Sequence, residues 1–494
     1  MNRQNEIGLT NQTNLTDDQQ TIVALCTPQG SGALALIRLC GSNVFSVVAA
    51  ISKLVCGKNV SQVDSHTIQF GFVIDPESGN SEYTDSIGYS KIDDVLFFLM
   101  RAPRTFTGQD TIEISCHNNP FIIEKIIQLS CKYGARMARP GEFSRRAVLN
   151  DKINLVQAEA INDLINAQNE LALKKSMEQL HGTLSNFLFG LQVDFVKLLA
   201  LVEACFEFIE EEQRDIDLNQ SIKTHSLQIL KKLNEVKVNF SQQKQIREGV
   251  KIALLGLVNT GKSTLFNALI NQERAIVSQV EGTTRDTIES SIYDNGIFLT
   301  FIDTAGLRQT GDVIEMQGIE RSLSQAQSAD LILLVFDATQ NLNLDQKSRY
   351  KEIIDLYLEK VIFVVNKIDQ SDFEKADASA NELRIFLKDY SNIIAVSAKE
   401  RSGMSALLQA VKGKIKEFFL MQQSSFLLNQ RQARLITEIE FKFDSVVKNH
   451  LNSLEYELMA YKLKEILELM FELTGRNINE HVLDSVFNEF CVGK

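Results

Sequence analysis

The sequence predicts a multidomain protein that combines α/β domains with an all-α helical bundle, and three observations support this fold class. The chain has 494 residues, which at roughly 100–200 residues per domain corresponds to about three domains. Strand-like and helix-like segments alternate over residues 248–418, and helical patterns flank them on both sides. None of the five prolines follows Pro140, which favours long uninterrupted helices downstream.

The composition is that of a soluble globular protein with an acidic balance. The formal net charge is −12, which argues against a protein that binds nucleic acid without a partner. RNA that is bound by a local basic patch or by a partner protein remains compatible with this charge. No apolar run approaches the ~18–20 residues of a membrane helix. Residues 1–20 read as a polar N-terminal extension without a signal-peptide pattern, and the seven cysteines include no CxxC pair. We therefore expect a cytoplasmic protein with no membrane contact.

Residues 21–143 are expected to form an N-terminal α/β domain. Short apolar runs bounded by turn residues are typical of strands, and they lie at 21–25, 33–39 and 94–100. Residues 120–134 have the apolar spacing of a helix and end at Gly134, as helices commonly do.

Two helical regions are predicted, at residues 144–247 and 419–494. Within them, residues 156–184 and 427–473 place apolar side chains three and four positions apart, the spacing of one helix face. The regions could be separate domains or one bundle with the central domain inserted into it. We favour one discontinuous bundle, because a domain tolerates insertion best where its own termini lie close together.

The central region, residues 248–418, is predicted to be a largely parallel sheet with helices on both faces. Its candidate strands are 251–256, 297–303, 331–337, 361–366 and 393–397.

A complete phosphate-loop pattern, GxxxxGK[ST], occupies residues 256–263 between the first candidate strand and a helix. In this pattern glycines let backbone N–H groups wrap the phosphates, Lys262 reaches the β and γ oxygens, and the Ser263 hydroxyl ligates magnesium. The pattern can arise by chance, so the prediction also depends on the motifs that follow.

Further motifs, each at a strand end, indicate GTP. DTAG at 303–306 places a carboxylate near magnesium and an N–H near the γ-phosphate. NKID at 366–369 places Asp369 where it can accept two hydrogen bonds from guanine, which adenine could not donate. SAK at 397–399 supplies a backbone contact to the guanine oxygen. These elements predict a GTPase rather than an ATPase.

One position departs from small signalling GTPases. The residue after DTAG is Leu307, where those proteins keep a glutamine that orients water. Another group must then orient the water, and the polar segment 309–317 contains two acids, Asp312 and Glu315. From spacing alone, either acid could be a solvated loop charge.

The chain resembles the MnmE (TrmE) family of bacterial tRNA-modification GTPases from about Thr21 to Lys494. The segments that carry the resemblance are TPQGSGALALIRLCG at 27–41, RAPRTFTGQDTIEISCHNNP at 101–120, RPGEF…QAEA within 139–165, EGTTRD at 281–286 and the terminal FCVGK at 490–494. Generic GTPases have neither RPGEF…QAEA nor this chain end.

The resemblance implies a tetrahydrofolate-binding N-terminal domain that dimerises, a helical domain in two segments and an inserted Ras-like GTPase domain. It implies a homodimer that forms a heterotetramer with the flavoprotein MnmG (GidA), with tRNA as substrate of the complex. The complex would install an aminomethyl or carboxymethylaminomethyl group at position five of the wobble uridine. A 5-formyl or methylene tetrahydrofolate derivative would serve as the one-carbon cofactor.

The same resemblance assigns functional residues. The folate positions are Arg38, Glu113, Lys152 and Lys494. Glu315 aligns with the acid that positions water and is a candidate catalytic residue, which leaves Asp312 as a loop charge.

Metal and nucleotide positions follow from the resemblance too. The magnesium positions are Ser263 and Thr284, and the potassium positions are Asn259, Ser278, Val280 and Thr283. The positions implied to contact GTP are Asn259, Thr260, Gly261, Lys262, Ser263, Thr264, Ser278, Gln279, Val280, Glu281, Gly282, Thr283, Thr284, Asp303, Thr304, Ala305, Gly306, Asn366, Lys367, Asp369, Ser397, Ala398 and Lys399.

The role of Cys491 and two departures from the family's pattern remain open at this point. Cys491, a second candidate catalytic residue, could act near the folate or the tRNA uridine, or could be a small core residue. The GHGG segment of the family is replaced by CHNN at 116–119, and the usual proline of the phosphate loop by Val258.

The alternative function is a GTP switch that assists ribosome assembly. Such proteins commonly append a basic RNA-binding domain, whereas residues 425–494 contain 8 Lys plus Arg and 11 Asp plus Glu, a net charge of −3. A scaffold with vestigial hydrolysis is a third reading, and the intact magnesium and guanine motifs argue against it.

Overall fold

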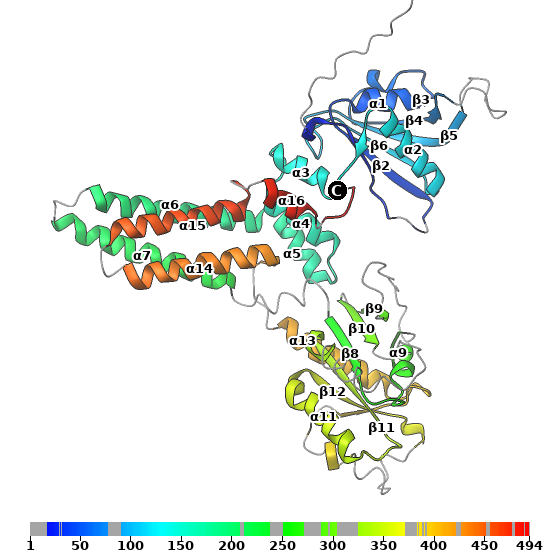
Figure 1. The fold of residues 1–494 in the computed structure, drawn as a ribbon, viewed down its shortest axis with the longest axis vertical. Helices are drawn as coiled ribbons and strands as arrows, with labels where there is room; N and C mark the ends of the chain where they lie inside the picture. Colours follow the sequence, from blue (N-terminus) through cyan, green and yellow to red (C-terminus); the bar gives the residue numbers. More distant parts are fainter. Residues whose placement is uncertain are drawn as a thin grey trace, which may run out of the picture. The chain divides into compact units, whose positions relative to one another are not determined.

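The structure is a computed structural model, in which the contacts divide the chain into two compact units. One unit comprises residues 1–162 and 467–494, and the other comprises residues 163–466 (Figure 1). The residues that the structure describes are 17–28, 30, 32–77, 90–207, 212–237, 250–270, 288–294, 297–303, 325–370, 383, 385–387, 390, 393–420, 426–450, 455–476, 480–488 and 490–493.

The first unit is built on a seven-stranded sheet with the strand order β3-β4-β5-β6-β2-β1-β7. Neighbouring strands are antiparallel except β1 and β7, which pair in parallel. The predicted strands at 21–25, 33–39 and 94–100 are confirmed as β1, β2 and part of β5, whereas β3, β4, β6 and β7 were not predicted. The strands are β1 Ile22–Leu25, β2 Leu34–Cys40, β3 Ser52–Leu54, β4 Thr67–Asp75, β5 Ser90–Met100, β6 Thr111–His117 and β7 Arg136–Met137.

Helices α1 (Val44–Ile51) and α2 (Pro120–Lys132) cover one face of this sheet and form its core. Large apolar side chains on the opposite face stay exposed: Leu34 to 62%, Ile68 to 60%, Phe70 to 50% and Leu96 to 40%. Phe70 and Leu96 are partners in the β4–β5 register. On the face opposite α1 and α2, the apolar side chains of β4, β5 and the start of β2 are therefore accessible, whereas those of β1 and the end of β2 are buried against Phe143.

Short helices complete the first unit. Helix α3 (Glu142–Leu149) contacts α16 (Glu480–Asn488), and α4 (Leu155–Ile165) begins in the same cluster of buried side chains. Gly141 has a φ of +63°, and a Cβ there would lie 2.7 Å from the carbonyl oxygen of Phe487. The glycine of the RPGEF segment thus lets the C-terminal helix approach the backbone at the start of α3.

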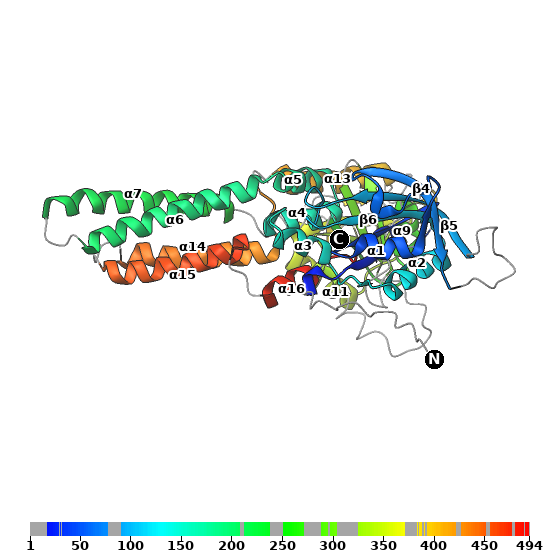
Figure 2. The ribbon, with the colours of Figure 1, turned by 90° about the horizontal axis from the view of Figure 1, so that it is seen from above.

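The predicted helical bundle consists of two chain segments packed together, which confirms the discontinuous arrangement (Figure 2). Helices α6 and α7 come from the first segment, and α14 and α15 from the second. The rings of Phe195 on α6 and Phe443 on α14 lie 5.0 Å apart, and α7 also contacts α14. The bundle helices are α5 Glu170–Leu180, α6 Thr183–Glu207, α7 Glu212–Lys237, α14 Gln430–His450 and α15 Tyr456–Thr474.

The apolar stripe predicted over 156–184 is divided among α4, α5 and the start of α6. Asn169 caps α5, its side chain accepting a hydrogen bond of 2.7 Å from the backbone N–H of Ala172. Gly182 has a φ of +95°, a conformation that ends a helix without steric cost. Caps and a left-handed glycine therefore break the helix without any proline. Beyond these breaks, α6 and α7 run for 25 and 26 residues, as the absence of proline predicts.

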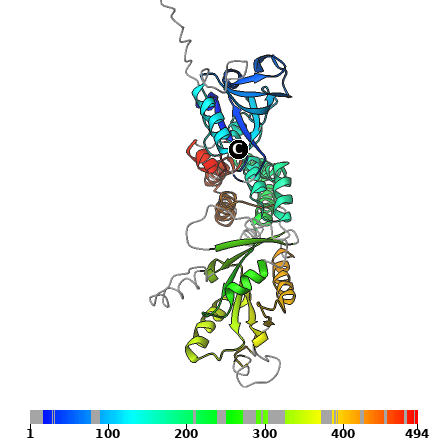
Figure 3. The same cartoon turned by 90° about the vertical axis from the view of Figure 1, so that its right-hand side faces the viewer.

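The central domain contains a six-stranded sheet in the order β13-β12-β11-β8-β10-β9. Its pairs are parallel except β9 with β10, so the largely parallel prediction is confirmed. Separate apolar cores lie on the two faces, and helices flank the sheet on both sides (Figure 3). The elements are β8 Val250–Leu255, α9 Lys262–Ile270, β9 Ile288–Asp294, β10 Ile297–Asp303, β11 Leu331–Asp337, α11 Leu344–Tyr357, β12 Val361–Asn366, β13 Ile393–Ala395 and α13 Met404–Leu420.

Among the described helices, none combines the length and the apolar composition needed to cross a membrane.

Candidate functional site

The phosphate loop connects the end of β8 to the start of α9. Gly256 has a φ of +154°, and a Cβ there would lie 2.4 Å from the carbonyl oxygen of Val335. Gly261 has a φ of +88°, and its Cβ would lie 2.3 Å from Nδ2 of Asn366. Gly256 is therefore required by the close approach of the β11 backbone, and Gly261 by its left-handed φ and the buried side chain of Asn366, independently of any phosphate.

The lysine and the hydroxyls of this motif gather at the first turn of α9. Lys262 Nζ donates to the carbonyl oxygens of Gly256 at 2.9 Å and Leu257 at 2.8 Å. Ser263 and Thr264 are exposed. A helix N-terminus with a lysine and exposed hydroxyls is a site that suits phosphate.

Asn259 has a left-handed backbone and an exposed side chain. Its φ is +65°, a region that asparagine tolerates better than most residues. Its carbonyl oxygen accepts a hydrogen bond of 2.6 Å from Lys367 Nζ. The backbone is thus anchored, while the amide predicted to ligate potassium is accessible.

Asn366 joins the phosphate loop to the predicted guanine end of the site. It is buried at the end of β12, and its Nδ2 donates to the carbonyl oxygen of Thr260 at 3.0 Å. Its Oδ1 accepts from the backbone N–H of Ala398, also at 3.0 Å. The structure therefore brings three predicted motifs together through one side chain.

Asp369, the predicted guanine acceptor, is exposed at this edge of the sheet. Its Oδ1 accepts a hydrogen bond of 2.6 Å from the hydroxyl of the buried Ser397. This hydrogen bond holds the pKa of the Asp369 carboxyl below its usual range. The carboxylate is therefore ionised and oriented by Ser397, a residue of another motif. Lys399, two residues after Ser397, is exposed.

Asp337 was not predicted to belong to the nucleotide site. Its position at the end of the predicted strand 331–337 could have indicated this, because the other motifs also follow strand ends. Its Oδ2 lies 2.6 Å from Lys367 Nζ, the same ammonium that holds Asn259. Burial by itself would raise the pKa of the Asp337 carboxyl, but hydrogen bonds from Lys367 and Thr339 bring it below its usual value. Asp337 thereby orients the lysine of the NKID motif.

Several predicted positions lie outside the described residues. Asp303 is the last residue of β10 and pairs with Leu254 of β8, which places its backbone beside the start of the phosphate loop. The positions outside the described residues are Ser278, Gln279, Val280, Glu281, Gly282, Thr283, Thr284, Thr304, Ala305, Gly306, Leu307, Asp312, Glu315 and Lys494.

Arg38 and Glu113, two predicted folate residues, form an ion pair across neighbouring strands. Their register on β2 and β6 is direct, and Arg38 Nε lies 2.7 Å from Glu113 Oε1. Arg38 Nη1 also donates to the carbonyl oxygen of Gly493 at 3.4 Å. The structure thus assembles two predicted positions beside the residue that precedes Lys494.

The chain end packs against the last residue of β1 and the cysteine that follows it. The thiol of Cys26 donates to the carbonyl oxygen of Gly493 at 3.2 Å. Gly493 has a φ of +97°, and a Cβ there would lie 2.5 Å from the carbonyl oxygen of Leu25. The glycine of FCVGK is therefore fixed by close packing.

Lys152 is exposed in the turn after α3. Its stem lies beside Gly108, whose Cβ would be 3.1 Å from Lys152 Cε. Among the described residues, no hydrogen bond or ion pair joins Lys152 to Arg38 or Glu113.

Cys491 is exposed, which excludes the core interpretation. Its carbonyl oxygen accepts a hydrogen bond of 3.3 Å from the N–H of Gly141. Its neighbour Phe490 is the buried residue, with its ring 5.0 Å from that of Phe487. The chain end is anchored by Phe490, and the thiol stays accessible.

The CHNN segment that replaces GHGG has a clear structural account. His117 Nδ1 lies 2.7 Å from Oδ1 of the buried Asp93, whose other oxygen accepts from the His117 N–H at 2.8 Å. Asn118 Nδ2 donates to the carbonyl oxygen of Gly30, and Asn119 Oδ1 accepts from the N–H of Phe121 and caps α2. The two asparagines therefore provide a loop contact and a helix cap.

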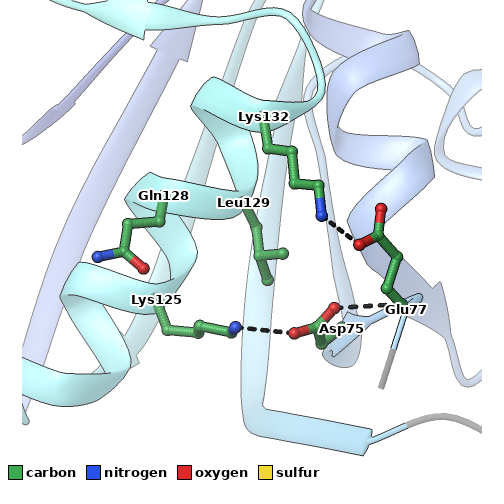
Figure 4. Close-up of a pocket in the computed structure, with 6 residues that line it drawn as sticks. All are labelled: Asp75, Glu77, Lys125, Gln128, Leu129 and Lys132. Carbon is green, nitrogen blue, oxygen red and sulfur yellow. Dashed lines mark hydrogen bonds and ion pairs between the residues drawn. The ribbon is translucent and has the colours of Figure 1, made fainter. Parts of the chain in front are cut away.

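A shallow surface hollow between α2 and the end of β4 contains none of the predicted positions (Figure 4). Lys125 Nζ lies 2.8 Å from Asp75 Oδ2, and Lys132 pairs with Glu77. The hydrogen bond from Lys125 lowers the pKa of the Asp75 carboxyl. Because these charged side chains of the hollow pair with one another, we assign no ligand to the hollow.

Comparisons with known proteins cover nearly the whole chain. Residues 21–152 match the family described as GTP-binding protein TrmE N-terminus, and residues 155–491 match the MnmE helical domain. A tRNA modification GTPase MnmE from Lactiplantibacillus plantarum is 34% identical over 485 residues, covering 97% of this chain and 99% of the relative. One from Moorella thermoacetica is 35% identical over 479 residues, covering 96% and 99%.

Solved structures that are similar to this chain include two GTP-binding proteins, and each of the two covers about a third of it. The G domain of the T. maritima FeoB iron transporter is 27% identical and covers 34% of this chain and 98% of that one, with a TM-score of 0.25. Era in complex with MgGDPNP and a ribosomal RNA segment is 26% identical and covers 33% and 56%, with a TM-score of 0.27. At these TM-scores the likeness carries no weight for function.

Proposed function

Because this chain belongs to the MnmE family of tRNA modification GTPases, we propose that it is the GTP-hydrolysing subunit of a complex that modifies the wobble uridine of certain tRNAs. The observation that carries this proposal is the convergence of residues 256–263, 366–369 and 397–399 at one edge of the central sheet. Asn366 links the three segments by hydrogen bonds, and Asp369 presents an ionised carboxylate there. A guanine edge donates two hydrogen bonds to such a group, and adenine does not.

For hydrolysis we propose magnesium at Ser263 and Thr284, and potassium at Asn259 with Ser278, Val280 and Thr283. The exposed Ser263 hydroxyl and the exposed amide of Asn259 support this, since oxygen ligands suit both cations. Bound beside the phosphates, these cations would neutralise negative charge that develops during hydrolysis. Glu315 as the residue that orients water stays a prediction.

In the first unit we propose a site for a 5-formyl or methylene tetrahydrofolate derivative at Arg38, Glu113, Lys152 and Lys494. The ion pair between Arg38 and Glu113 supports it, because Glu113 uses Oε1 for Arg38 and a carboxylate has a second oxygen that can accept from a pterin amide. The anionic tail of the folate would then meet the lysines. Calorimetry with 5-formyl-tetrahydrofolate tests the site directly.

We further propose that the accessible apolar face of the seven-stranded sheet is where a second copy of the chain binds. Four large apolar side chains are exposed there, Leu34, Ile68, Phe70 and Leu96, and a patch of this kind commonly marks an interface. A twofold dimer presents the same patch on both copies, so one apolar face suffices. Phe70→Glu should produce monomers in analytical ultracentrifugation, whereas Phe121→Glu, on the exposed side of α2, should stay dimeric.

We place the complex with the flavoprotein MnmG and tRNA in the cytoplasm, with the exposed Cys491 as a candidate for chemistry near the folate or uridine. Mass spectrometry of tRNA nucleosides from cells lacking this protein tests the function. Loss of the wobble modification, restored by the wild-type protein but not by Asp369→Asn, is expected. Unchanged nucleosides would refute the proposal, and a ribosome-assembly defect in their place would favour the alternative function.

A further inference from the structure

A tyrosine from α11 lies directly beneath the phosphate loop. Tyr350 is 2% exposed, and its hydroxyl accepts a hydrogen bond of 3.1 Å from the backbone N–H of Leu257, the second residue of the loop. The same hydroxyl donates to the carbonyl oxygen of Val335 on β11 at 2.9 Å. One oxygen atom therefore connects the loop to the central strand of the sheet.

This hydroxyl takes the place of a missing hydrogen bond in the β8–β11 ladder. The parallel pairing of these strands ends with Leu255 opposite Leu334. Continuing the pattern would join the Leu257 N–H directly to the Val335 carbonyl, and these are the two groups that Tyr350 bridges. The strand thus leaves the sheet at the point where a hydroxyl is inserted.

The carbonyl group of Leu257 is held by two side chains of the phosphate loop. Its oxygen accepts hydrogen bonds from the Thr260 hydroxyl at 3.0 Å and from Lys262 Nζ at 2.8 Å. Lysine in this motif turns to the phosphates when nucleotide is bound, so the second contact is then given up. Tyr350 and Thr260 would remain as the anchors of Leu257.

The tyrosine itself is fixed in place. Its ring stacks on Phe336 with the centroids 4.2 Å apart. Burial raises the pKa of the Tyr350 hydroxyl, so the group stays protonated and can accept from Leu257 while donating to Val335.

We propose that Tyr350 is a positioning residue for the nucleotide site, which sets the first turn of the phosphate loop before the phosphates bind. This inference rests on the proposed binding of GTP between residues 256–263 and 366–369, and it adds a residue that none of the sequence motifs contains. Tyr350 makes no contact with the reacting atoms in this role. It acts through the backbone of Leu257.

The test compares Tyr350→Phe with Tyr357→Phe in the full-length protein. Both changes keep the aromatic ring and remove a hydroxyl from α11, but no described residue hydrogen-bonds to the Tyr357 hydroxyl. We expect Tyr350→Phe to release GDP about tenfold faster, the factor that corresponds to about 1.4 kcal/mol. The KM for GTP should rise while kcat changes less, and Tyr357→Phe should match the wild type.

A purely structural role would lower the melting temperature and leave the GDP release rate and KM unchanged, and that outcome overturns the proposal. The wild-type protein offers a second test that needs no variant. Its Leu257 amide should be protected from hydrogen exchange without nucleotide, and rapid exchange there would also overturn the proposal. If the wild type itself binds no GTP, the proposed function fails instead, so the two failures are distinguishable.

Discussion

Substitutions of Asn259 can distinguish two roles of this residue, as a ligand of potassium and as the residue that adopts the left-handed conformation of the phosphate loop. Its left-handed φ of +65° means that Asn259→Ala removes the amide and also adds strain of about 1 kcal/mol. That strain alone would weaken nucleotide binding roughly fivefold. Asn259→Gly removes the same amide without the strain, and Asn259→Asp keeps an oxygen at the same place.

The assay is GTP turnover in potassium chloride compared with sodium chloride at equal ionic strength. We expect the wild type to be much faster in potassium, because a positive charge against the developing phosphate charge, such as an arginine finger, contributes a factor of roughly 10³–10⁵ in GTPases. Both Asn259→Ala and Asn259→Gly should reduce the ratio of the two rates to about one, and Asn259→Asp should retain part of it.

The comparison of Ala with Gly decides the interpretation. If Asn259→Gly keeps the wild-type ratio while Asn259→Ala loses it, the asparagine serves the loop conformation and the ligand assignment is wrong. Equal turnover of the wild type in the two salts would refute the potassium site altogether.

Three further outcomes test the guanine and folate sites. Asp369→Asn should weaken GTP binding by roughly tenfold to a hundredfold, since hydrogen bonds to a charged group contribute about 1.5–3 kcal/mol, and shift preference toward xanthosine nucleotides; an unchanged titration would contradict the guanine contact. The hydrogen bond from Ser397 lowers the pKa of Asp369, so GTP binding is present above that pKa and lost as the pH falls through it. Ser397→Ala should therefore move the loss of GTP affinity on acidification to a higher pH. A loss at the same pH as in the wild type would contradict this. Arg38→Ala and Glu113→Gln should each weaken 5-formyl-tetrahydrofolate binding in calorimetry with GTP turnover nearly intact, and normal folate affinity in both would remove that site.

Sequence patterns predicted the elements of the central domain closely, because the signals are local. Runs of β-branched and apolar residues form the buried strands β8, β11 and β12, and each nucleotide motif follows directly after a strand. In a parallel sheet the ends of such strands meet at one edge. Chain order and motif position were therefore sufficient to predict that residues 256–263, 366–369 and 397–399 come together.

The first unit was predicted less completely. Strands β4 and β6 were not predicted. In β4 apolar and polar residues do alternate from Thr67, but the apolar positions Ile68 and Phe70 are the exposed ones. Alternation can indicate a strand, but it does not show that the apolar side of that strand stays accessible. Helix breaks at Asn169 and Gly182 likewise depend on caps that periodicity does not reveal.

The sequence by itself determined the family, the GTPase motifs and the two-segment bundle, because residue type and spacing encode which positions are buried and which carry chemistry. The tertiary structure alone decided the hydrogen-bond partners: Tyr350 beneath Leu257, Asp337 on Lys367, and the chain end beside Arg38. It also decided that Cys491 is exposed while Phe490 is buried. The reason is that strand order, register and the packing of whole elements determine which distant residues become hydrogen-bond partners. The residues next to each partner in the chain do not encode these features.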